Sequence, residues 1–238
     1  MNVFVSGGTR GIGRAIALRF ARDGAKRVAL GYLRNDQAAE ETADELRALG
    51  TEVTLVRGNV TSERVGAEVA ALGPLDVLVH NAATGVIRPA LETEDKHWDW
   101  TMNANARALL QLSRAAAPQM PDGSSIVAIS SLGAQRVLAN YTLVGTSKAA
   151  LEALVRYLAV EFAPRIRVNA VSGGVVETDA LDHFPNREAM RAAGRANPVG
   201  KMVSPEDIAG AVAFLCSPDA DMVRGQTLVV DGGFSLRA

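Results

Sequence analysis

The feature that most constrains the fold is a glycine-rich turn set between an apolar strand and a helical pattern. Residues 2–6 have the pattern of a strand, and residues 7–13 follow with glycine at Gly7, Gly11 and Gly13. Bare backbone matters here because a pyrophosphate can approach the amide N–H groups of a helix N-terminus only where no Cβ intervenes. The G-x-x-x-G-x-G spacing is a relative of the dinucleotide fingerprint, and its strand-turn-helix context favours that interpretation over an ordinary glycine turn.

Apolar runs and helical patterns alternate along the rest of the chain. Strands separated by helices imply a parallel sheet that is covered on both faces. We therefore expect an α/β fold of the Rossmann type, a doubly wound seven-stranded parallel sheet in a single domain over residues 1–238. The expected strands lie at residues 2–6, 27–32, 52–56, 75–79, 126–131, 166–171 and 227–230.

Composition excludes several classes of protein. The 238 residues are 48% hydrophobic, enough to fill a sizeable core, and a formal net charge of -1 does not suit a nucleic-acid binder. No apolar run reaches membrane-spanning length and the strand pattern starts within a residue of Met1, so we expect a cytoplasmic protein without membrane contact. Cys216 is the only cysteine and the three histidines are widely spaced, so we expect neither an intramolecular disulfide nor a metal site.

The end of the second expected strand carries no acidic residue. In the dinucleotide fold an Asp or Glu near this point binds the adenosine ribose and would repel a 2′-phosphate, whereas arginine would pair with one. Arg34 follows this strand and Arg10 lies in the glycine-rich turn, so we expect NADPH rather than NADH. The alternative is that Arg34 is a solvated loop charge.

Residues 140–148 pair a phenol with an ammonium group. Tyr141 and Lys148 are separated by about two turns of an expected helix, at ~1.5 Å per residue, so both side chains would lie on one face. A nearby lysine favours the phenolate and eases proton transfer, because a free phenol titrates near ~10. The alternative is a core tyrosine with a solvated lysine.

Polar residues elsewhere suit a site at the carboxyl ends of the strands, where open α/β sheets bind ligands. Ser131 ends the fifth strand. Asn105 lies in a long helical pattern that starts at Thr93, and it is either a catalytic spacer or a helix residue bonded to backbone. Residues 180–203 carry several arginines and no strand signal, which suits a mobile lid over a substrate pocket.

With these pieces placed, the chain resembles the short-chain dehydrogenase/reductase family over nearly its full length. The matching motif residues are Gly7, Gly11 and Gly13 of the cofactor loop, Asn105, Ser131, Lys148, Thr178 and the terminal Asp231-Gly232-Gly233. Four departures conserve shape: Ser6 for threonine, Asn59 for aspartate, residues 81–83 for Asn-Asn-Ala-Gly, and Gly173-Gly174 for Pro-Gly. The expected cofactor-binding set is Gly7, Thr9, Arg10, Gly11, Ile12, Gly13, Arg34, Asn59, Val60, Asn81, Ala82, Lys148, Gly174 and Thr178.

The informative departure is the position of the tyrosine. The family's common spacing, Tyr-x-x-x-Lys, would require tyrosine where this sequence has Val144. Tyr141 gives Tyr-x6-Lys instead, which looks like the enoyl-acyl-carrier-protein reductases, in particular their type III, NADPH-using members. The resemblance implies that Tyr141 protonates the substrate and that Lys148 holds ribose hydroxyls and lowers the pKa of the tyrosine. Ser131, auxiliary at most, and Asn105 complete the catalytic set.

A physical reason links this spacing to the reaction. In ketone reduction the carbon that accepts hydride bears the oxygen that needs a proton, whereas in an enoyl thioester the charge appears on an oxygen two carbons away from that carbon. Moving a phenol three residues along a helix shifts it by roughly 4.5 Å within ~60° of the same face. We therefore expect NADPH-dependent reduction of the 2,3-double bond of enoyl thioesters carried by acyl carrier protein or CoA, in fatty-acid or polyketide biosynthesis.

Two alternatives stay open. Ser131 and Asn105 also suit an NADPH-dependent 3-oxoacyl thioester reductase, against which Val144 argues, and a non-catalytic NADP-binding sensor or scaffold would need no phenol. The resemblance further implies a homo-oligomer, either a tetramer or a dimer. For an acidic acyl carrier protein, arginines every four residues at 187, 191 and 195 would form a basic stripe on a helix, or else a merely solvated face.

Overall fold

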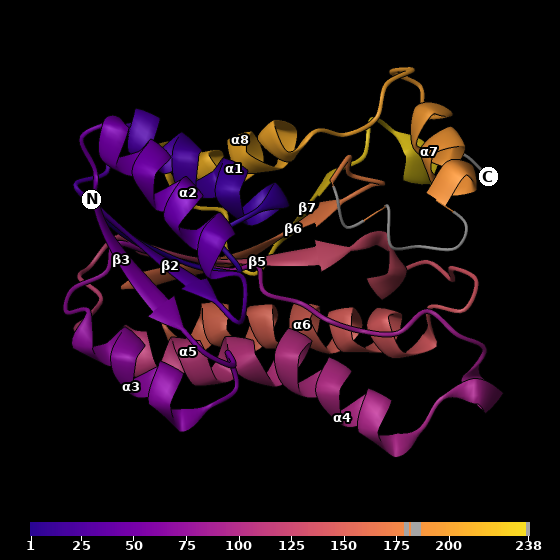
Figure 1. Cartoon of the computed structure of the whole chain (residues 1–238), viewed down its shortest axis with the longest axis horizontal. Coiled ribbons are helices and arrows are strands. Elements are labelled where there is room, and N and C mark those ends of the chain that lie inside the picture. The colour runs from indigo at the N-terminus through magenta and orange to yellow at the C-terminus, as the bar shows by residue number, and fades with distance from the viewer. Residues whose placement is uncertain (179–180, 182–186, 237–238) are drawn as a thin grey trace.

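The computed structural model describes residues 1–178, 181 and 187–236 and contains a seven-stranded sheet (Figure 1). The strand order is β3-β2-β1-β4-β5-β6-β7, and all neighbours are parallel. This confirms the expected Rossmann-type fold. The strands are β1 (Asn2–Ser6), β2 (Arg27–Tyr32), β3 (Glu52–Arg57), β4 (Val77–His80), β5 (Ser124–Ser131), β6 (Ile166–Gly173) and β7 (Thr227–Val230).

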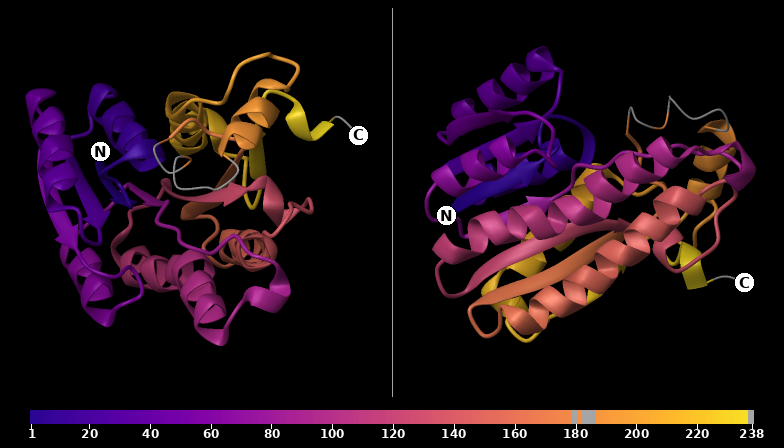
Figure 2. Two further views of the ribbon diagram at one scale, coloured as in Figure 1. Left: turned by 45° about the vertical axis from the view of Figure 1, so that its right-hand side comes forward. Right: turned by 90° about the horizontal axis from the view of Figure 1, so that it is seen from below.

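Helices cover both faces of the sheet (Figures 1 and 2). One face carries α1 (Gly11–Arg22), α2 (Asp36–Ala48) and α8 (Pro205–Cys216), and the other carries α3 (Glu63–Ala71), α5 (Ala108–Ala116) and α6 (Thr142–Glu161). Alternation along β1 shows why the two layers form, because successive strand side chains point to opposite faces. Val3 and Val5 pack in the core under α1 and α8, whereas Phe4 packs in the core under α5 and α6.

The strand order reverses between β1 and β4. From β1 the chain adds strands outward through β2 and β3, and from β4 it adds them in the other direction through β5, β6 and β7. In open α/β sheets the crevice at such a point, at the carboxyl ends of the strands, is where ligands bind. The glycine-rich turn after β1 lies at this crevice.

The long helix expected from Thr93 onward is wrong in one respect. The structure has α4 (Asp95–Met102), a π-helical turn over Asn103–Arg107 and then α5. A π-turn inserts a residue into the helical ladder and releases a backbone carbonyl from its usual partner, which is common at functional sites. Asn105 lies inside this turn, fully buried.

The expected lid over residues 180–203 lies partly outside the described residues, which exclude 179–180 and 182–186. Its described part contains α7 (Arg187–Arg195), and Val203 bridges Val176. Within the described ranges no helix is long and apolar enough to cross a bilayer. Nor do any three His, Cys, Asp or Glu side chains of that part of the chain gather to hold a metal ion.

Candidate active site

The glycine-rich turn is built so closely that side chains would not fit. Gly7 and Gly11 adopt φ angles of 64° and 51°, in the left-handed region that favours glycine. A Cβ on Gly13 would collide with the carbonyl oxygen of Gly7 and lie 2.7 Å from Asn81 Nδ2. Arg10, the N-cap of α1, provides no side-chain cap, so the first amides of the helix have no acceptor from that side chain.

The end of β4 is fastened to this turn. Asn81 Nδ2 donates to the carbonyl oxygens of Gly7 and Ser6, at 2.9 and 3.2 Å. The hydroxyl oxygen of Ser6 accepts from the backbone N–H groups of Asn81 and Ala82, both at 3.1 Å. The side chain of Asn81 therefore shapes the turn, and Ala82 leaves the surface of the crevice free of a long side chain.

Gly13→Ala is expected to damage the turn, because its new methyl group has no space. Overpacking of this kind costs about 1–3 kcal/mol, and the displaced turn should bind the expected dinucleotide more weakly by about tenfold or more. Thermal unfolding and titration with NADPH measure the two effects. Gly66→Ala is the matched control, since a Cβ there meets nothing within 4 Å on α3 and should stabilise the helix by about 0.5–1 kcal/mol.

Some of the other expected cofactor residues lie beside the glycine-rich turn, and others lie elsewhere. Thr178 lies beside the turn, since a Cβ on Gly11 would come 3.4 Å from Thr178 Cγ2. Gly174 instead packs against the terminal motif, where its Cβ would lie 3.0 Å from the Cβ of Asp231. Asn59 is exposed, and its Oδ1 accepts from the backbone N–H and the hydroxyl of Thr61, so this oxygen has local partners.

Five further members of the set lie in the turns that follow β1, β2 and β3 or at the start of α1. Thr9 is buried and its carbonyl accepts from the Thr42 hydroxyl at 2.9 Å, which holds the turn to α2. Arg10 and Arg34 are exposed, the latter in the turn between β2 and α2. The remaining two, Ile12 and Val60, are partly buried against the two cores.

Tyr141 lies at the N-cap of α6, at the carboxyl end of β5. Its Oη shares a hydrogen bond of 3.3 Å with Ser131 Oγ. The ring rests on bare backbone, because a Cβ on Gly133 would come 2.5 Å from two ring carbons. Burial raises the pKa of the phenol above its ordinary value, and the hydrogen bond from Ser131 opposes that rise only in part.

Lys148 lies two turns further along α6 and is only 5% exposed. Its Nζ donates to the carbonyl oxygen of Ile129 at 2.7 Å. The pairing of β4 with β5 ends at Ala128, so this carbonyl lies beyond the last β4 partner. Burial lowers the pKa of the ammonium to about 8.

The expectation that Lys148 lowers the pKa of Tyr141 is therefore wrong for this structure. The ammonium is bonded to the β5 backbone, and burial dominates the pKa of the phenol. The phenol is held as a neutral acid, with one hydroxyl neighbour, near the end of the strand.

Asn105 is bonded to backbone and to α6, and does not point at Tyr141. Its Oδ1 accepts from the Thr84 N–H, and its Nδ2 donates to the Thr84 carbonyl and to Ser147 Oγ, all at 2.9 Å. Val144 stands at the position that the common tyrosine spacing would use, and it is buried. It packs so closely against Gly85 that a Cβ on Gly85 would collide with it. A phenol at that position would have to displace the loop that follows β4.

Sequence reasoning missed Asn140, which precedes the phenol. Asn140 has a φ of 61°. Among the described residues it is the one residue other than glycine that has a positive φ. Its carbonyl accepts from the Arg88 N–H at 3.0 Å, which ties the loop after β4 to the start of α6. Asparagine tolerates the left-handed region better than most residues, so an asparagine directly before the tyrosine was a usable signal.

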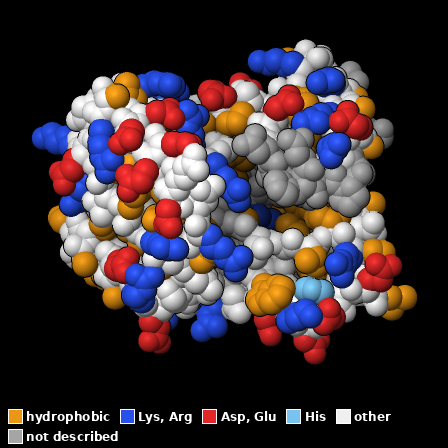
Figure 3. Space-filling model, in the orientation of Figure 1, with side chains coloured by type: hydrophobic (Ala, Val, Ile, Leu, Met, Phe, Trp, Pro, Cys, Tyr) orange, Lys and Arg blue, Asp and Glu red, His pale blue; other side chains and the backbone are white. Residues whose placement is uncertain are grey.

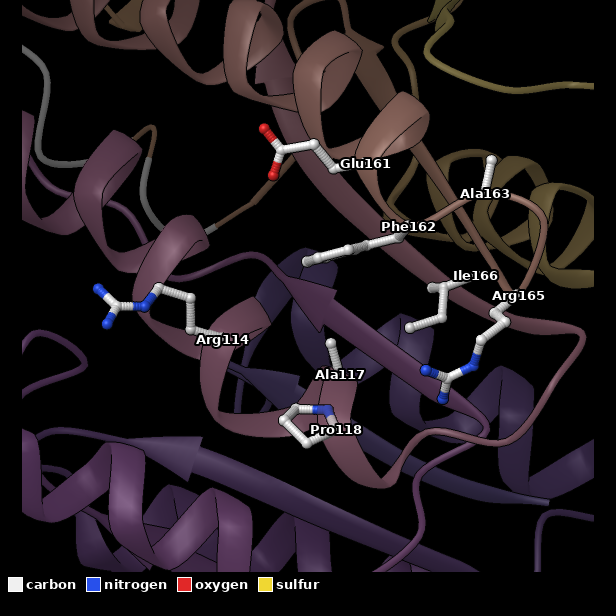
Figure 4. Close-up of a pocket in the computed structure, with 8 residues that line it drawn as sticks. All are labelled: Arg114, Ala117, Pro118, Glu161, Phe162, Ala163, Arg165 and Ile166. Carbon is white, nitrogen blue, oxygen red and sulfur yellow. The ribbon is translucent and has the colours of Figure 1, made fainter.

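This face of the molecule is hollowed near its centre, with Lys and Arg side chains at the edge of the hollow (Figure 3). A separate surface hollow of about 420 Å³ lies at the amino end of β6, the opposite edge of the sheet from Tyr141. There Phe162 and Ile166 lie between Arg114 and Arg165 (Figure 4). Because parallel sheets bind ligands at their carboxyl edge, the candidate site is the crevice around Tyr141 and not this second hollow.

Comparison with known proteins decides the family. A family model described as enoyl-(acyl carrier protein) reductase matches residues 7–235. The chain belongs to the short-chain dehydrogenase/reductase family. It is an oxidoreductase of this family. Its sequence is 38% identical to that of a 1-cyclohexenylcarbonyl-CoA reductase from Streptomyces collinus, and the match covers 98% of this chain and 86% of that protein.

Solved structures of the short-chain dehydrogenase/reductase family agree in fold. A dehydrogenase/reductase from Sinorhizobium meliloti has a TM-score of 0.90 and 36% identity, and the match covers 98% of this chain and 94% of that one. A blue fluorescent protein from a metagenomic library, solved in complex with NADPH, has a TM-score of 0.90 and 35% identity, over 98% and 97% of the two chains.

Proposed function

We propose that this protein is an NADPH-dependent reductase of the 2,3-double bond of enoyl thioesters. The observation that carries the proposal is the position of the phenol. Tyr141 lies beside Ser131 at the carboxyl end of β5, while Val144 fills the alternative position and packs against Gly85. A phenol displaced by about one turn suits an oxygen that lies two carbons from the reduced carbon.

A family model and one relative support the proposal. The matching family model is described as an enoyl-(acyl carrier protein) reductase. The Streptomyces collinus relative is named for a CoA thioester whose cyclohexenyl group carries a double bond beside the carbonyl. Both descriptions concern reduction of an unsaturated acyl thioester, which favours the alkene over the ketone as the group reduced here.

The crevice fits NADPH. The uncapped start of α1 and the bare turn suit a pyrophosphate, and Tyr32 rather than an acid ends β2. Arg34, which follows this strand, and Arg10, in the glycine-rich turn, are exposed and would pair with a 2′-phosphate. Lys148 Nζ has one bond to Ile129, and an ammonium can donate three, so it would hold ribose hydroxyls. Bound NADPH supplies the hydride for the β-carbon.

The residues of the chain have distinct roles in this proposal. Tyr141, held neutral by burial, donates a hydrogen bond and then a proton to the thioester oxygen as negative charge develops there. Ser131 orients the phenol through their shared hydrogen bond. Asn105 has an auxiliary role, because its amide is committed to Thr84 and Ser147.

Arg34→Glu is expected to weaken NADPH binding by about tenfold or more while changing NADH binding much less. The substitution replaces a charge that attracts the 2′-phosphate with one that repels it. Fluorescence titration with each nucleotide measures the effect. Arg22→Glu at the end of α1, at the far end of that helix from the turn, is the control for a general change of surface charge.

Asn140 is expected to aim the phenol. Asn140→Gly should keep most of the turnover, because glycine adopts positive φ readily, whereas Asn140→Val should lose about tenfold or more, because a β-branched residue resists that conformation. Steady-state turnover of the two variants checks this. Equal turnover in both would show that the left-handed backbone at this position has no bearing on the phenol.

The proposed carriers of the acyl group are acyl carrier protein or CoA, and the proposed assembly is a homo-oligomer. The stripe expected on α7 is less available than the sequence suggested. Arg191 lies 3.1 Å from Glu188 and 3.6 Å from Glu177, and Arg187 lies 3.8 Å from Glu188. Part of the positive charge offered to an acidic carrier is thus compensated within the chain.

The test supplies NADPH with crotonyl and acetoacetyl thioesters in separate reactions, each as CoA and acyl-carrier-protein forms, and identifies the products. Conversion of the crotonyl thioester to the saturated product supports the proposal. Oxidation of NADPH with only the acetoacetyl thioester would establish a 3-oxoacyl reductase instead. Tight NADPH binding with turnover of neither would indicate a sensor or scaffold.

A further inference from the structure

His80, at the end of β4, is a fully buried histidine that the reaction proposed above does not use. Its Nε2 lies 3.0 Å from the carbonyl oxygen of Asn105, and its Nδ1 lies 3.2 Å from Ser6 Oγ. A carbonyl oxygen can only accept, so Nε2 carries the proton and Nδ1 accepts from the serine hydroxyl. The surroundings of the ring therefore fix one tautomer.

The imidazole is also fixed in its neutral form. Burial first, and the nearby ammonium of Lys148 second, lower the pKa of His80 to about 4, against the opposing effect of bonds to the carbonyls of Asn105 and Ala104. A neutral ring with one donor and one acceptor can join two different parts of the protein without a net charge in the core.

On one side the ring is connected to the glycine-rich turn. Ser6 donates to His80 and accepts from the backbone N–H groups of Asn81 and Ala82 at 3.1 Å. Asn81 in turn holds the carbonyl of Gly7 at 2.9 Å. Every group in this half of the network has a partner, so a change at Nδ1 reaches the part of the crevice that takes the pyrophosphate.

On the other side the ring is connected to the catalytic helix. The carbonyl that it binds belongs to the π-turn, and the same residue, Asn105, donates from its side chain to Ser147 Oγ at 2.9 Å. Ser147 donates to the Val144 carbonyl at 2.7 Å, within α6, and it directly precedes Lys148. The two connections thus meet at a single ring.

We propose that His80 is a positioning residue that holds the nucleotide-binding turn and the Tyr141–Lys148 segment of α6 in one register, through Nδ1 to Ser6 and through Nε2–H to Asn105. The proposal rests on the proposed function in so far as Tyr141 and Lys148 act on substrate and nucleotide. The ring touches neither, so its effect is transmitted by the hydrogen-bonded chain.

Two substitutions separate the two connections. In His80→Asn the amide oxygen can replace Nδ1 as acceptor for Ser6, but nothing reaches Asn105. In His80→Gln the longer amide can donate to the Asn105 carbonyl, but Ser6 loses its acceptor. Loss of one buried hydrogen bond is worth roughly tenfold. We expect His80→Asn to lose about tenfold in kcat with a smaller loss of NADPH affinity, because Lys148 lies in the loosened segment, and His80→Gln to lose about tenfold in NADPH affinity with a smaller loss of kcat.

The readouts are the NADPH dissociation constant, kcat with whichever thioester the wild-type protein reduces, and amide hydrogen exchange of residues 7–13 and 141–148. Exchange needs no substrate: His80→Gln should raise it in the turn, and His80→Asn should raise it in α6. Thermal unfolding gives the folded fraction for each variant.

The outcomes decide the proposal. Opposite effects of the two variants on affinity and turnover, with matching exchange, support it. Parallel losses that follow only the fall in stability, or no change in either variant, overturn it. If the wild-type protein reduces a ketone and not an alkene, the proposed function fails while the contrast between the two variants still tests His80.

Discussion

Tyr141→Phe is expected to lower kcat by about 10²–10⁴-fold, the contribution that a positioned acid makes to proton transfer. The phenylalanine ring fills the same space against Gly133 and removes only the hydroxyl that meets Ser131. NADPH affinity and thermal stability should therefore stay near those of the wild-type protein. Product formation from a crotonyl thioester under saturating NADPH measures the loss.

Tyr157→Phe is the control for this change. Tyr157 lies on the same helix but is 70% exposed, so its hydroxyl should contribute nothing to turnover. A Tyr141→Phe protein with nearly full turnover would remove the phenol from the reaction. The acid would then have to be water or another hydroxyl, and the argument from tyrosine spacing would lose its basis.

Lys148→Met is expected to abolish most activity, by weakening NADPH binding and by leaving the nucleotide ribose without its ammonium partner. The substitution conserves side-chain length in a buried position, so the protein should fold. We expect kcat/KM for NADPH to fall by about 10²-fold or more, the typical scale for loss of a preorganised charged donor. Retention of wild-type kcat/KM would contradict the role assigned to this lysine.

The low pKa of Lys148 gives the same prediction a pH dependence. Because the folded-state pKa is about 8, kcat/KM for NADPH should decline above about pH 8 as the ammonium loses its proton. Lys148→Arg, where any activity remains, should lack this decline because arginine stays protonated. A decline of equal midpoint in both proteins would assign it to another group.

Stability should change in the opposite direction. Between about pH 8 and the ordinary lysine value of 10.5, the unfolded chain binds a proton at this position that the folded protein does not. The free energy of unfolding therefore gains a positive contribution as the pH rises through this window, and burial of the ammonium costs stability below it. Comparison of wild-type and Lys148→Met unfolding across this pH range isolates the effect.

Periodicity was sufficient for the fold because strand and helix patterns are local. The seven strands appear where apolar runs lie, and the buried faces of α1 and α6 follow the helical pattern. The π-turn at Asn103–Arg107 escaped because one inserted residue barely disturbs an apolar stripe. Its presence changes the role of Asn105 from a helix residue into a hub of hydrogen bonds.

The sequence predicted that Tyr141 and Lys148 lie together, but it did not predict their hydrogen-bond partners. The spacing of Tyr141 and Lys148 indicated one helix face, and both lie at the end of β5. The sequence analysis expected a lowered pKa for Tyr141, whereas burial raises it. The spacing of two residues along a chain shows how far apart they lie but not how deeply either is buried. Asn140 and His80 were missed because their roles depend on a backbone angle and on a buried contact between distant strands, which no local pattern records.

The glycine beneath the ring of Tyr141 gives a criterion for other sequences that have the same tyrosine-to-lysine spacing. Where an alanine or a larger residue stands in the place of Gly133, the methyl group would occupy the plane on which the ring of Tyr141 rests. Such a chain could keep the same tyrosine-to-lysine interval and still be unable to seat its phenol this way. One small residue outside the recognised motif thus separates sequences that can share this geometry from those that only share its spacing.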